Sequence, residues 1–405
     1  MIALEHLTRD GWLLFATRCS RMFAYGLLSI VLVLYLAELG LSDWQIGLLL
    51  TLTLAGDTAI SLWLTTSADC WGRRRTLIVG AALMLLAGVA FAMTGEFLLL
   101  VVAATIGVIS PSGNEIGPFL SVEQAALSQV IHDHRRTDIF AWYNLAGSFA
   151  TALGAWTGGW LTSQAQASGF AGAHAYLPAL LFYAGIGGAL MIGFCGLSPA
   201  IEATVAPPTA TAPRMMWGLH QSRRTVRNLS LLFALDAFGG GFVIQSVLAY
   251  WFRVRFQLDL ASLGTIFLFA NLLAGVSALA AGWLARRIGL VNTMVFTHLP
   301  SNVLLMLVPL MPDANWAVGL LLLRFSISQM DVPARQAYTM AVVRPEERSA
   351  AAGITAVARS VGASVSPLLA TVCIGQAGLL SVPFLLAGGL KIVYDLLLYR
   401  AASKV

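Results

Sequence analysis

The sequence consists mainly of apolar stretches long enough to cross a lipid bilayer, separated by short polar or charged segments. A transmembrane helix needs about 20 mostly apolar residues, because it rises about 1.5 Å per residue through about 30 Å of hydrocarbon. Only 11% of the 405 residues are charged, and the mean hydropathy is +0.79. Soluble domains carry roughly 25% charged residues, so this composition indicates a membrane protein. Because the apolar runs are continuous rather than alternating, helices are favoured over a β-barrel.

Turn residues and charges divide the sequence into twelve predicted transmembrane spans. The spans cover residues 11–37, 43–66, 76–95, 97–129, 139–162, 176–196, 228–252, 260–284, 290–311, 314–342, 350–374 and 378–399. The fourth and tenth are long and interrupted, the fourth by Pro111 and Gly113 and the tenth by Pro333. Such interruptions are tolerated in a membrane where the backbone faces a polar cavity or other helices. These two spans are therefore predicted to line a pathway.

The basic residues between the spans predict the orientation of the chain. If the amino terminus is cytoplasmic, the outer loops hold only Arg253 and Arg255. The inner loops then hold Arg73, Arg74, Arg75, Arg135, Arg136, Arg214, Arg223, Arg224, Arg227, Arg286, Arg287, Arg344 and Arg348. Because cytoplasmic loops are enriched in Lys and Arg, both termini are predicted to be cytoplasmic, in the cell (inner) membrane. The net charge of +5 reflects this topology, and no nucleic-acid partner is expected.

The longest polar stretch separates two groups of six predicted spans. It reads "SPAIEATVAPPTATAPRMMWGLHQSRRTVRN". Its Pro-, Ala- and Thr-rich first part cannot form a core, and its basic second part suits anionic lipid headgroups. The sequence therefore predicts a first six-helix bundle at 1–197, a cytoplasmic linker at 198–226 and a second bundle at 227–405.

Two segments of the first half recur at equivalent places in the second half. "SADCWGRRRTLIV" after the second span corresponds to "LARRIGLVNTMV" after the eighth, which aligns Gly72 with Gly289. "VEQAALSQVIHDHRRT" after the fourth span corresponds to "ARQAYTMAVVRPEERS" after the tenth, which aligns Glu123 with Arg335. The matches indicate a parallel repeat about an axis along the membrane normal.

The segment from Thr65 to Arg74 resembles the signature loop of the major facilitator superfamily, whose pattern is G-x-L-A-D-R-x-G-R-R between the second and third helices. The matching residues are Asp69, Gly72, Arg73 and Arg74; Thr65 and Cys70 depart from the pattern. The second half keeps Gly282, Leu284, Ala285, Arg287 and Gly289, with Arg286 in place of the acid. The resemblance covers essentially the whole chain. It implies an all-α membrane protein with twelve transmembrane helices in two pseudo-symmetric six-helix bundles.

In the superfamily the acid of this loop is held against the eleventh helix, which is expected here to begin near Ser349. The resemblance therefore implies a conformational latch made by Asp69, Gly72 and Arg73. Gly72 would supply the unusual backbone angles of a tight loop. Asp69 would accept hydrogen bonds at a helix start, in contacts that form in one conformation and break in another. The alternative is that the arginines only fix orientation and bind lipid headgroups.

Charged residues inside the predicted spans are candidates for a substrate and proton pathway, because each isolated charge costs at least about 2.5–3.5 kcal/mol at a helix centre. The candidates are Arg18, Asp57, Glu115, Glu123, Asp236, Arg324, Asp331 and Arg335, and the spans also hold Arg21 and Arg359. All eight candidates except Asp57 lie on the first, fourth, seventh and tenth helices, which line the cavity in the superfamily. Glu123 and Arg335 occupy equivalent repeat positions, so they are predicted to approach as a pair, either a cytoplasmic gate or a permanent ion pair.

A coupling proton needs a buried acid whose proton affinity changes with its surroundings. Asp57, Glu115 and Asp236 are the candidates, and a satisfied structural hydrogen bond is the alternative for each. His298 is expected to be a core residue.

We expect a secondary active transporter that moves a small molecule by alternating access, coupled to protons and directed towards efflux. The alternatives are a lipid or amphiphile translocase or scramblase, and an uptake symporter of an organic anion. No complete catalytic motif is found, so an enzyme is not expected. The cysteines Cys19, Cys70, Cys195 and Cys373 lack metal-binding spacing, so no cofactor beyond the proton motive force is expected. We expect the protein to be a monomer whose partners are its small-molecule substrate and membrane lipids.

Overall fold

The structure is a computed structural model that describes residues 7–113, 119–131, 136–202, 221–344 and 347–402. All regular secondary structure in these ranges is helical. The first group of helices is α1 (Arg9–Glu38), α2 (Asp43–Trp71), α3 (Arg73–Met93), α4 (Phe97–Ile106), α5 (Phe119–Val130), α6 (Arg136–Ala167) and α7 (Leu177–Cys195). The second group is α8 (Arg223–Gly241), α9 (Gln245–Phe256), α10 (Leu260–Ile288), α11 (Leu290–Leu307), α12 (Ala314–Phe325), α13 (Asp331–Val342), α14 (Arg348–Ile374) and α15 (Val382–Ala402).

Each predicted span coincides with one helix or with two consecutive helices. Among the described residues, nine helical stretches are long and apolar enough to cross a membrane, and each overlaps a predicted span. The other three predicted spans contain α4 with α5, α6, and α12 with α13. Helix starts agree with local chemistry: Thr8 caps α1 by accepting from the Gly11 N–H, and Ser42 and Gln45 form a capping box at α2.

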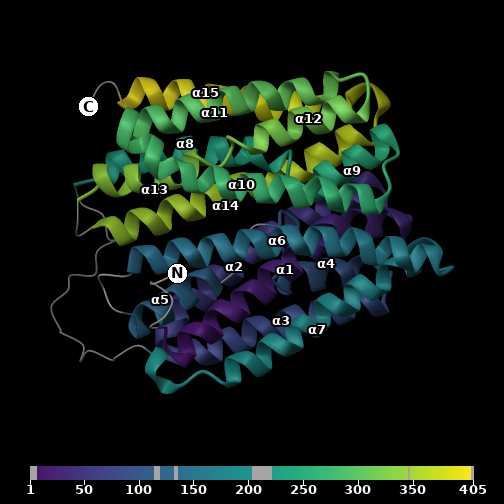
Figure 1. Cartoon of the computed structure of the whole chain (residues 1–405), viewed down its shortest axis with the longest axis horizontal. Helices are drawn as coiled ribbons and strands as arrows, with labels where there is room; N and C mark the ends of the chain where they lie inside the picture. The colour runs from purple at the N-terminus through teal and green to yellow at the C-terminus, as the bar shows by residue number, and fades with distance from the viewer. Residues whose placement is uncertain (1–6, 114–118, 132–135, 203–220, 345–346, 403–405) are drawn as a thin grey trace.

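The two groups of helices lie one above the other in Figure 1, with α1–α7 below and α8–α15 above. Within the first group α1 packs on α6 and α3 on α7, and within the second α8 packs on α14 and α11 on α15. Between the groups, α2 packs on α14 and α6 on α10. At the second contact a Cβ on Gly159 would clash with the Leu260 carbonyl oxygen, so glycine permits the close approach.

The helices run between two opposite faces of the molecule. At one face, which we call the Gly72 end, α2 turns into α3, α7 ends, and α8 and α14 begin. At the other face, the Asp43 end, α1 and α9 end and α2 and α10 begin. Helix α1 begins and helix α15 ends at the Gly72 end, which is on the left of Figure 1.

Within the residues that the structure describes, three spans are broken near the middle of the molecule. The fourth breaks after Ile106 in the region of Pro111 and Gly113, as predicted. The tenth breaks over residues 326–330 and not at Pro333, which lies in the first turn of α13. Proline lacks an N–H, and the N–H groups of a first helical turn have no intrahelical partner, so Pro333 begins a helix instead of ending one. The seventh span also breaks, over residues 242–244.

Candidate functional site

A cavity of about 560 Å³ lies between the two groups of helices. Residues of α1, α2 and α6 line it on one side, and residues of the second group line it on the other. The broken segments contribute Ser112, Ile244 and Ser328 to its wall. Non-helical backbone at membrane depth is tolerated where it lines a cavity, so the helices can break at these positions.

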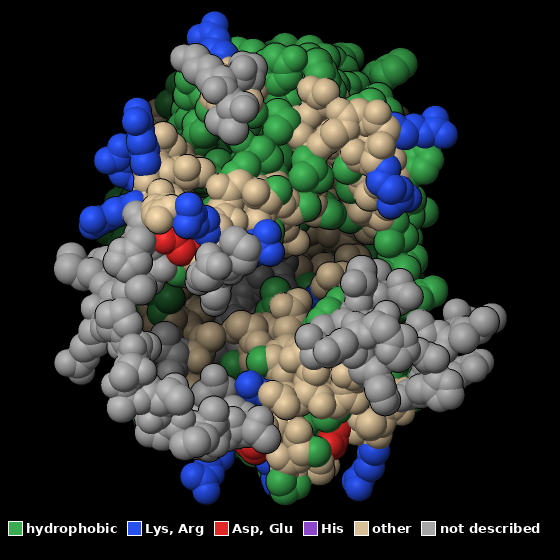
Figure 2. Space-filling view, turned by 90° about the vertical axis from the view of Figure 1, so that its left-hand side faces the viewer, with side chains coloured by type: hydrophobic (Ala, Val, Ile, Leu, Met, Phe, Trp, Pro, Cys, Tyr) green, Lys and Arg blue, Asp and Glu red, His purple; other side chains and the backbone are tan. Residues whose placement is uncertain are grey.

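The two groups are joined by hydrogen bonds in the half of the molecule nearer the Asp43 end. Among the described residues, four hydrogen bonds that involve side chains cross between the groups there. They join Tyr250 to Asp43 at 2.6 Å, the Leu368 N–H to Thr51 at 3.3 Å, Gln245 to Ser29 at 2.7 Å, and Ser246 to the Pro111 carbonyl. Figure 2, which faces the left-hand side of Figure 1, shows the opposite, Gly72 end hollowed between the two groups. The groups therefore meet near one face and separate towards the other.

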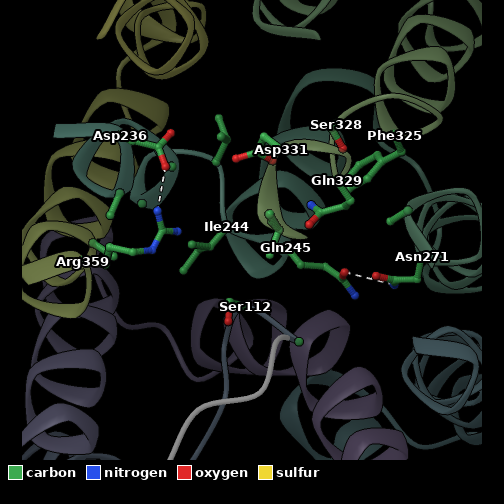
Figure 3. Close-up of a pocket in the computed structure, with 18 of the residues that line it drawn as sticks. Ser112, Asp236, Ile244, Gln245, Asn271, Phe325, Ser328, Gln329, Asp331 and Arg359 are labelled. Atoms are coloured by element: carbon green, nitrogen blue, oxygen red, sulfur yellow. Dashed lines mark hydrogen bonds and ion pairs between the residues drawn. The ribbon is translucent and has the colours of Figure 1, made fainter. Parts of the chain in front are cut away.

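The most highly charged part of the cavity wall surrounds Asp236 on α8, whose side chain is 2% exposed. Its Oδ2 lies 3.1 Å from Arg335 Nη1 on α13 and 2.8 Å from Arg359 Nη1 on α14. Its Oδ1 lies 2.6 Å from Lys391 Nζ on α15. Arg335 also pairs with Asp331 at 3.0 Å, one helical turn earlier on α13. Asp236 thus ties four helices of the second group to one point. Figure 3 shows its contact with Arg359.

His298 on α11 connects Asp236 to a second buried carboxylate, Asp395 on α15. Its Nδ1 lies 2.8 Å from Asp395 Oδ1, and its Nε2 lies 3.7 Å from Asp236 Oδ1. Asn302 donates to the other Asp395 oxygen at 3.3 Å. The expectation of a core residue is correct in that His298 is buried, but the imidazole also lines the cavity and sits between two acids. We call Asp236, His298, Asp331, Arg335, Arg359, Lys391 and Asp395 the Asp236 cluster.

Arg359 and His298 were not among the eight predicted pathway residues, although Arg359 was noted as a charge within a span and His298 as a core residue. Lys391 and Asp395 were not singled out at all. Both lie inside the predicted twelfth span, so the cost of burying a charge in a membrane would have identified them.

The predicted pairing of Glu123 with Arg335 does not form in this structure. Glu123 on α5 is fully buried and accepts from Arg21 on α1, with Nη1–Oε1 at 2.7 Å and Nη2–Oε2 at 2.9 Å. Tyr143 on α6 donates to the same carboxylate at 2.5 Å. Glu123 and Arg335 each find partners within their own group of helices, so neither is left to pair with the other.

The predicted pathway residues divide into two sets. Asp57, Asp236, Arg324, Asp331 and Arg335 line the cavity. Glu123 and Arg18 lie behind its wall in the first group, where Arg18 donates to Asn144 at 3.1 Å and sits 4.2 Å from the Tyr143 ring centroid. Glu115 lies outside the described residues. The structure brings Asp236, Asp331 and Arg335 of the second group together, and it pairs Glu123 within the first group.

The loop of the predicted latch is built around Gly72, whose φ of 98° joins α2 directly to α3. Gly289, its repeat equivalent, has a φ of 88° and joins α10 to α11 in the same way. Glu202, which the sequence did not single out, accepts from the backbone N–H groups of Arg73 at 2.6 Å and Arg74 at 3.2 Å. A carboxylate at a helix start is favoured by the helix dipole. The side chain of Asp69 lies outside the described residues, so its role stays a prediction.

An uncharged polar surface lies on the other side of the cavity from the Asp236–Arg359 pair (Figure 3). Asn271 on α10 donates to Gln245 on α9 at 3.1 Å. Ser328 and Gln329, in the break before α13, lie on the same side. The cavity therefore offers an ionic surface and an amide and hydroxyl surface, the combination that fixes the orientation of a polar small molecule.

Known proteins resemble the chain over almost its full length. The family model described as Major Facilitator Superfamily matches residues 14–367. An uncharacterized membrane protein of Saccharomyces cerevisiae, YJR124C, is 31% identical over 419 residues, covering 96% of this chain and 93% of the yeast protein.

Solved structures of transporters share the fold. A mutant of the nucleoside transporter NupG has a TM-score of 0.78 at 12% identity, and the match covers 97% of this chain and 99% of the NupG chain. A D-xylose–proton symporter has a TM-score of 0.74 at 14% identity, covering 96% and 97%. The human organic anion transporter MFSD10 has a TM-score of 0.66 at 18% identity, covering 96% and 99%. The chain belongs to the major facilitator superfamily and is a membrane-spanning transporter of that family.

Proposed function

We propose that the protein is a proton-coupled secondary active transporter that exports a small molecule by alternating access, with Asp236 as the coupling acid. The observation that carries this proposal is the Asp236 carboxylate, buried in the cavity wall and held by Arg335, Arg359 and Lys391. Three cations stabilise its ionised form, and a proton must compete with them. Any movement that separates the cations from Asp236 makes protonation easier, which links the proton to the conformation.

The Asp236 cluster is placed to respond to movement. Its partners come from α11, α13, α14 and α15, and α14 also packs on α2 of the first group. A rotation of one group against the other would act on α14 first and alter the Arg359–Asp236 contact at 2.8 Å. One of the structural neighbours is a D-xylose–proton symporter, so this fold is compatible with proton coupling.

Alternating access is supported by the asymmetry between the two faces. The contacts near the Asp43 end, such as Tyr250 with Asp43, would break while the Gly72 end closes. In this proposal the Gly72 end is cytoplasmic in the cell membrane, as the loop arginines predict, and the cavity faces inward. Residues 1–197 and 227–405 act as the two moving bundles and 198–226 as their linker. Asp69, Gly72 and Arg73 act as the latch.

Transport measurements with purified protein in liposomes test the proposal. The vesicles contain a trapped fluorescent pH indicator. A library of small molecules is screened for compounds whose transport by the protein changes the pH inside the vesicles. We expect Asp236→Asn to abolish substrate-driven proton movement while substrate exchange between the two sides persists, because exchange needs no net proton transfer. Asp10→Asn is the control, since Asp10 is also buried but bonds Ser198 at the Gly72 end. Unchanged proton movement in Asp236→Asn would refute the coupling role.

A second candidate function is uptake of an organic anion by proton symport. Among the described residues that line the cavity, Arg324, Arg335, Arg359 and Lys391 outnumber the carboxylates Asp57, Asp236 and Asp331. The same vesicles distinguish the candidates: proton-driven export acidifies the compartment that the substrate leaves, whereas symport acidifies the compartment that the substrate enters. Flux of fluorescent lipid without a gradient would indicate a translocase or scramblase instead.

A further inference from the structure

The end of α12 presents to the cavity an arginine that has no ion-pair partner among the described residues. Arg324 lies in the last helical turn and lines the cavity, and no described carboxylate is within ion-pair distance of its guanidinium. Its Nε makes no hydrogen bond to any described residue, and its guanidinium carbon lies 5.1 Å from the Phe325 ring centroid. Asp331, the acid seven positions later, pairs with Arg335 instead. Arg324 is partly buried, and a partly buried cation without a nearby carboxylate is poorly compensated, so an anion that enters the cavity is favoured there.

The segment that follows Arg324 adds a second polar group that lacks a partner. Ser328 is 6% exposed, lines the cavity, and has a hydroxyl oxygen without a hydrogen-bond partner among the described residues. A buried hydroxyl without a partner is costly, and ligands satisfy such groups in binding sites. Gln329 lies beside Ser328 and on the same side of the cavity as the Gln245–Asn271 amide pair (Figure 3).

The other cationic side chains of the cavity already have carboxylate partners. The nitrogen–oxygen distances to the Asp236 carboxylate are 3.1 Å for Arg335, 2.8 Å for Arg359 and 2.6 Å for Lys391. Arg324 is thus the described cavity cation that is available to a ligand without breaking an existing ion pair. Guanidinium binds carboxylate and phosphate through two parallel hydrogen bonds, a geometry that a neutral substrate cannot supply.

We infer that the break between α12 and α13 is the binding subsite for the acidic group of the substrate, a small soluble organic anion bearing a carboxylate or a phosphate. Arg324 binds two of its oxygens and the Ser328 hydroxyl donates to one of them. The amides of Gln329, Gln245 and Asn271 contact the polar body of the molecule. This inference rests on the proposed function, because it treats the cavity as a transport site.

Binding of defined probes to the purified full-length protein tests the subsite. The readout is the shift in thermal unfolding temperature with sodium benzoate, with its neutral analogue benzamide, with inorganic phosphate and with a short-chain phosphatidic acid. Ligands that bind the folded state raise this temperature by mass action. We expect benzoate or inorganic phosphate to produce a saturable increase and benzamide to produce none. Arg324→Gln should weaken the apparent affinity for the anion by about tenfold or more, as expected for a lost charge-assisted bond.

Matched variants separate a binding role from a structural one. Arg255→Gln removes another arginine that lies over a phenylalanine, 5.5 Å from the Phe256 ring centroid, but outside the cavity lining. We expect it to bind the anion like the wild type. Arg324→Lys should restore part of the affinity, since it keeps the charge and loses the two-point geometry. Ligand-free Arg324→Gln should unfold at the wild-type temperature or above it, because the substitution removes a partly buried cation that has no described carboxylate within ion-pair distance.

Several outcomes would overturn the inference. Arg324→Gln could bind the anion as tightly as the wild type, or benzamide could raise the unfolding temperature as much as benzoate does. Benzoate and phosphate could both leave the unfolding temperature unchanged. A shift with phosphatidic acid alone would assign the site to a lipid headgroup. A large drop in the ligand-free unfolding temperature of Arg324→Gln would make Arg324 structural. These measurements need no proton gradient. Failure of the anion subsite is therefore distinguishable from failure of proton coupling, which only the Asp236 experiment reports.

Discussion

Arg21 and Glu123 form a two-point ion pair inside the first group of helices, with nitrogen–oxygen distances of 2.7 and 2.9 Å and both side chains fully buried. The pair fixes α1 to α5, and Tyr143 on α6 completes the bonding of the carboxylate. All three helices belong to the same group. Both roles predicted for Glu123, a gate or a permanent ion pair between the two halves, required Arg335 as its partner, so the pair with Arg21 gives Glu123 a different role within one group of helices.

Removing one member of this pair should destabilise the protein strongly. Glu123→Gln or Arg21→Gln leaves the other charge buried without compensation, which costs about 3–5 kcal/mol. We expect either single variant to unfold at a much lower temperature, measured by fluorescence-detected size-exclusion chromatography after heating. The double variant Arg21→Met with Glu123→Leu should recover most of the loss, because neither charge of the pair is then left without its partner. A single variant as stable as the wild type would instead support a gate that opens and closes.

His298 should help to hold the buried Asp395 carboxylate in place. Its Nδ1 lies 2.8 Å from Asp395 Oδ1, and its Nε2 lies 3.7 Å from Asp236 Oδ1. We expect His298→Ala to lower the unfolding temperature, because a buried carboxylate that loses a hydrogen-bond partner costs about 1–3 kcal/mol. The measurement is fluorescence-detected size-exclusion chromatography after heating. His174→Ala is the control, since His174 is exposed in the short 3₁₀ helix η2 (Gly172–Tyr176). Equal unfolding temperatures of the two variants would show that the His298 contacts add nothing to stability.

The two equivalent glycines should differ in their response to alanine. Both have a positive φ, a conformation that costs a non-glycine residue about 1–3 kcal/mol. A Cβ on Gly72 would also lie 3.3 Å from a carboxylate oxygen of Glu202, whereas a Cβ on Gly289 meets nothing within 4 Å. We expect Gly72→Ala to lower the unfolding temperature more than Gly289→Ala and to slow transport more. Equal effects of the two substitutions would show that the Glu202 contact adds nothing to the latch.

Much of the fold could be predicted from the sequence because membrane insertion depends on local composition. A run such as residues 11–37 is apolar enough to span a bilayer wherever it packs, and α1 covers it as Arg9–Glu38. The repeat that aligns Gly72 with Gly289 was equally visible, because a backbone turn with positive φ requires glycine in both halves. The position of the tenth break was wrong, since Pro333 has a different meaning in a first helical turn than in a helix interior.

The sequence by itself determined that ionised side chains lie within apolar helices and must therefore face one another or water, because lipid cannot solvate them. It did not determine which charges meet. Only the tertiary structure decided three of these relationships. Glu123 binds Arg21 and not Arg335, and α15 brings Lys391 and Asp395 to the Asp236 cluster. Arg324 has no carboxylate partner among the described residues. The physical reason is that ion pairing depends on distances of a few ångströms between side chains from different helices, and helix rotation and packing set those distances.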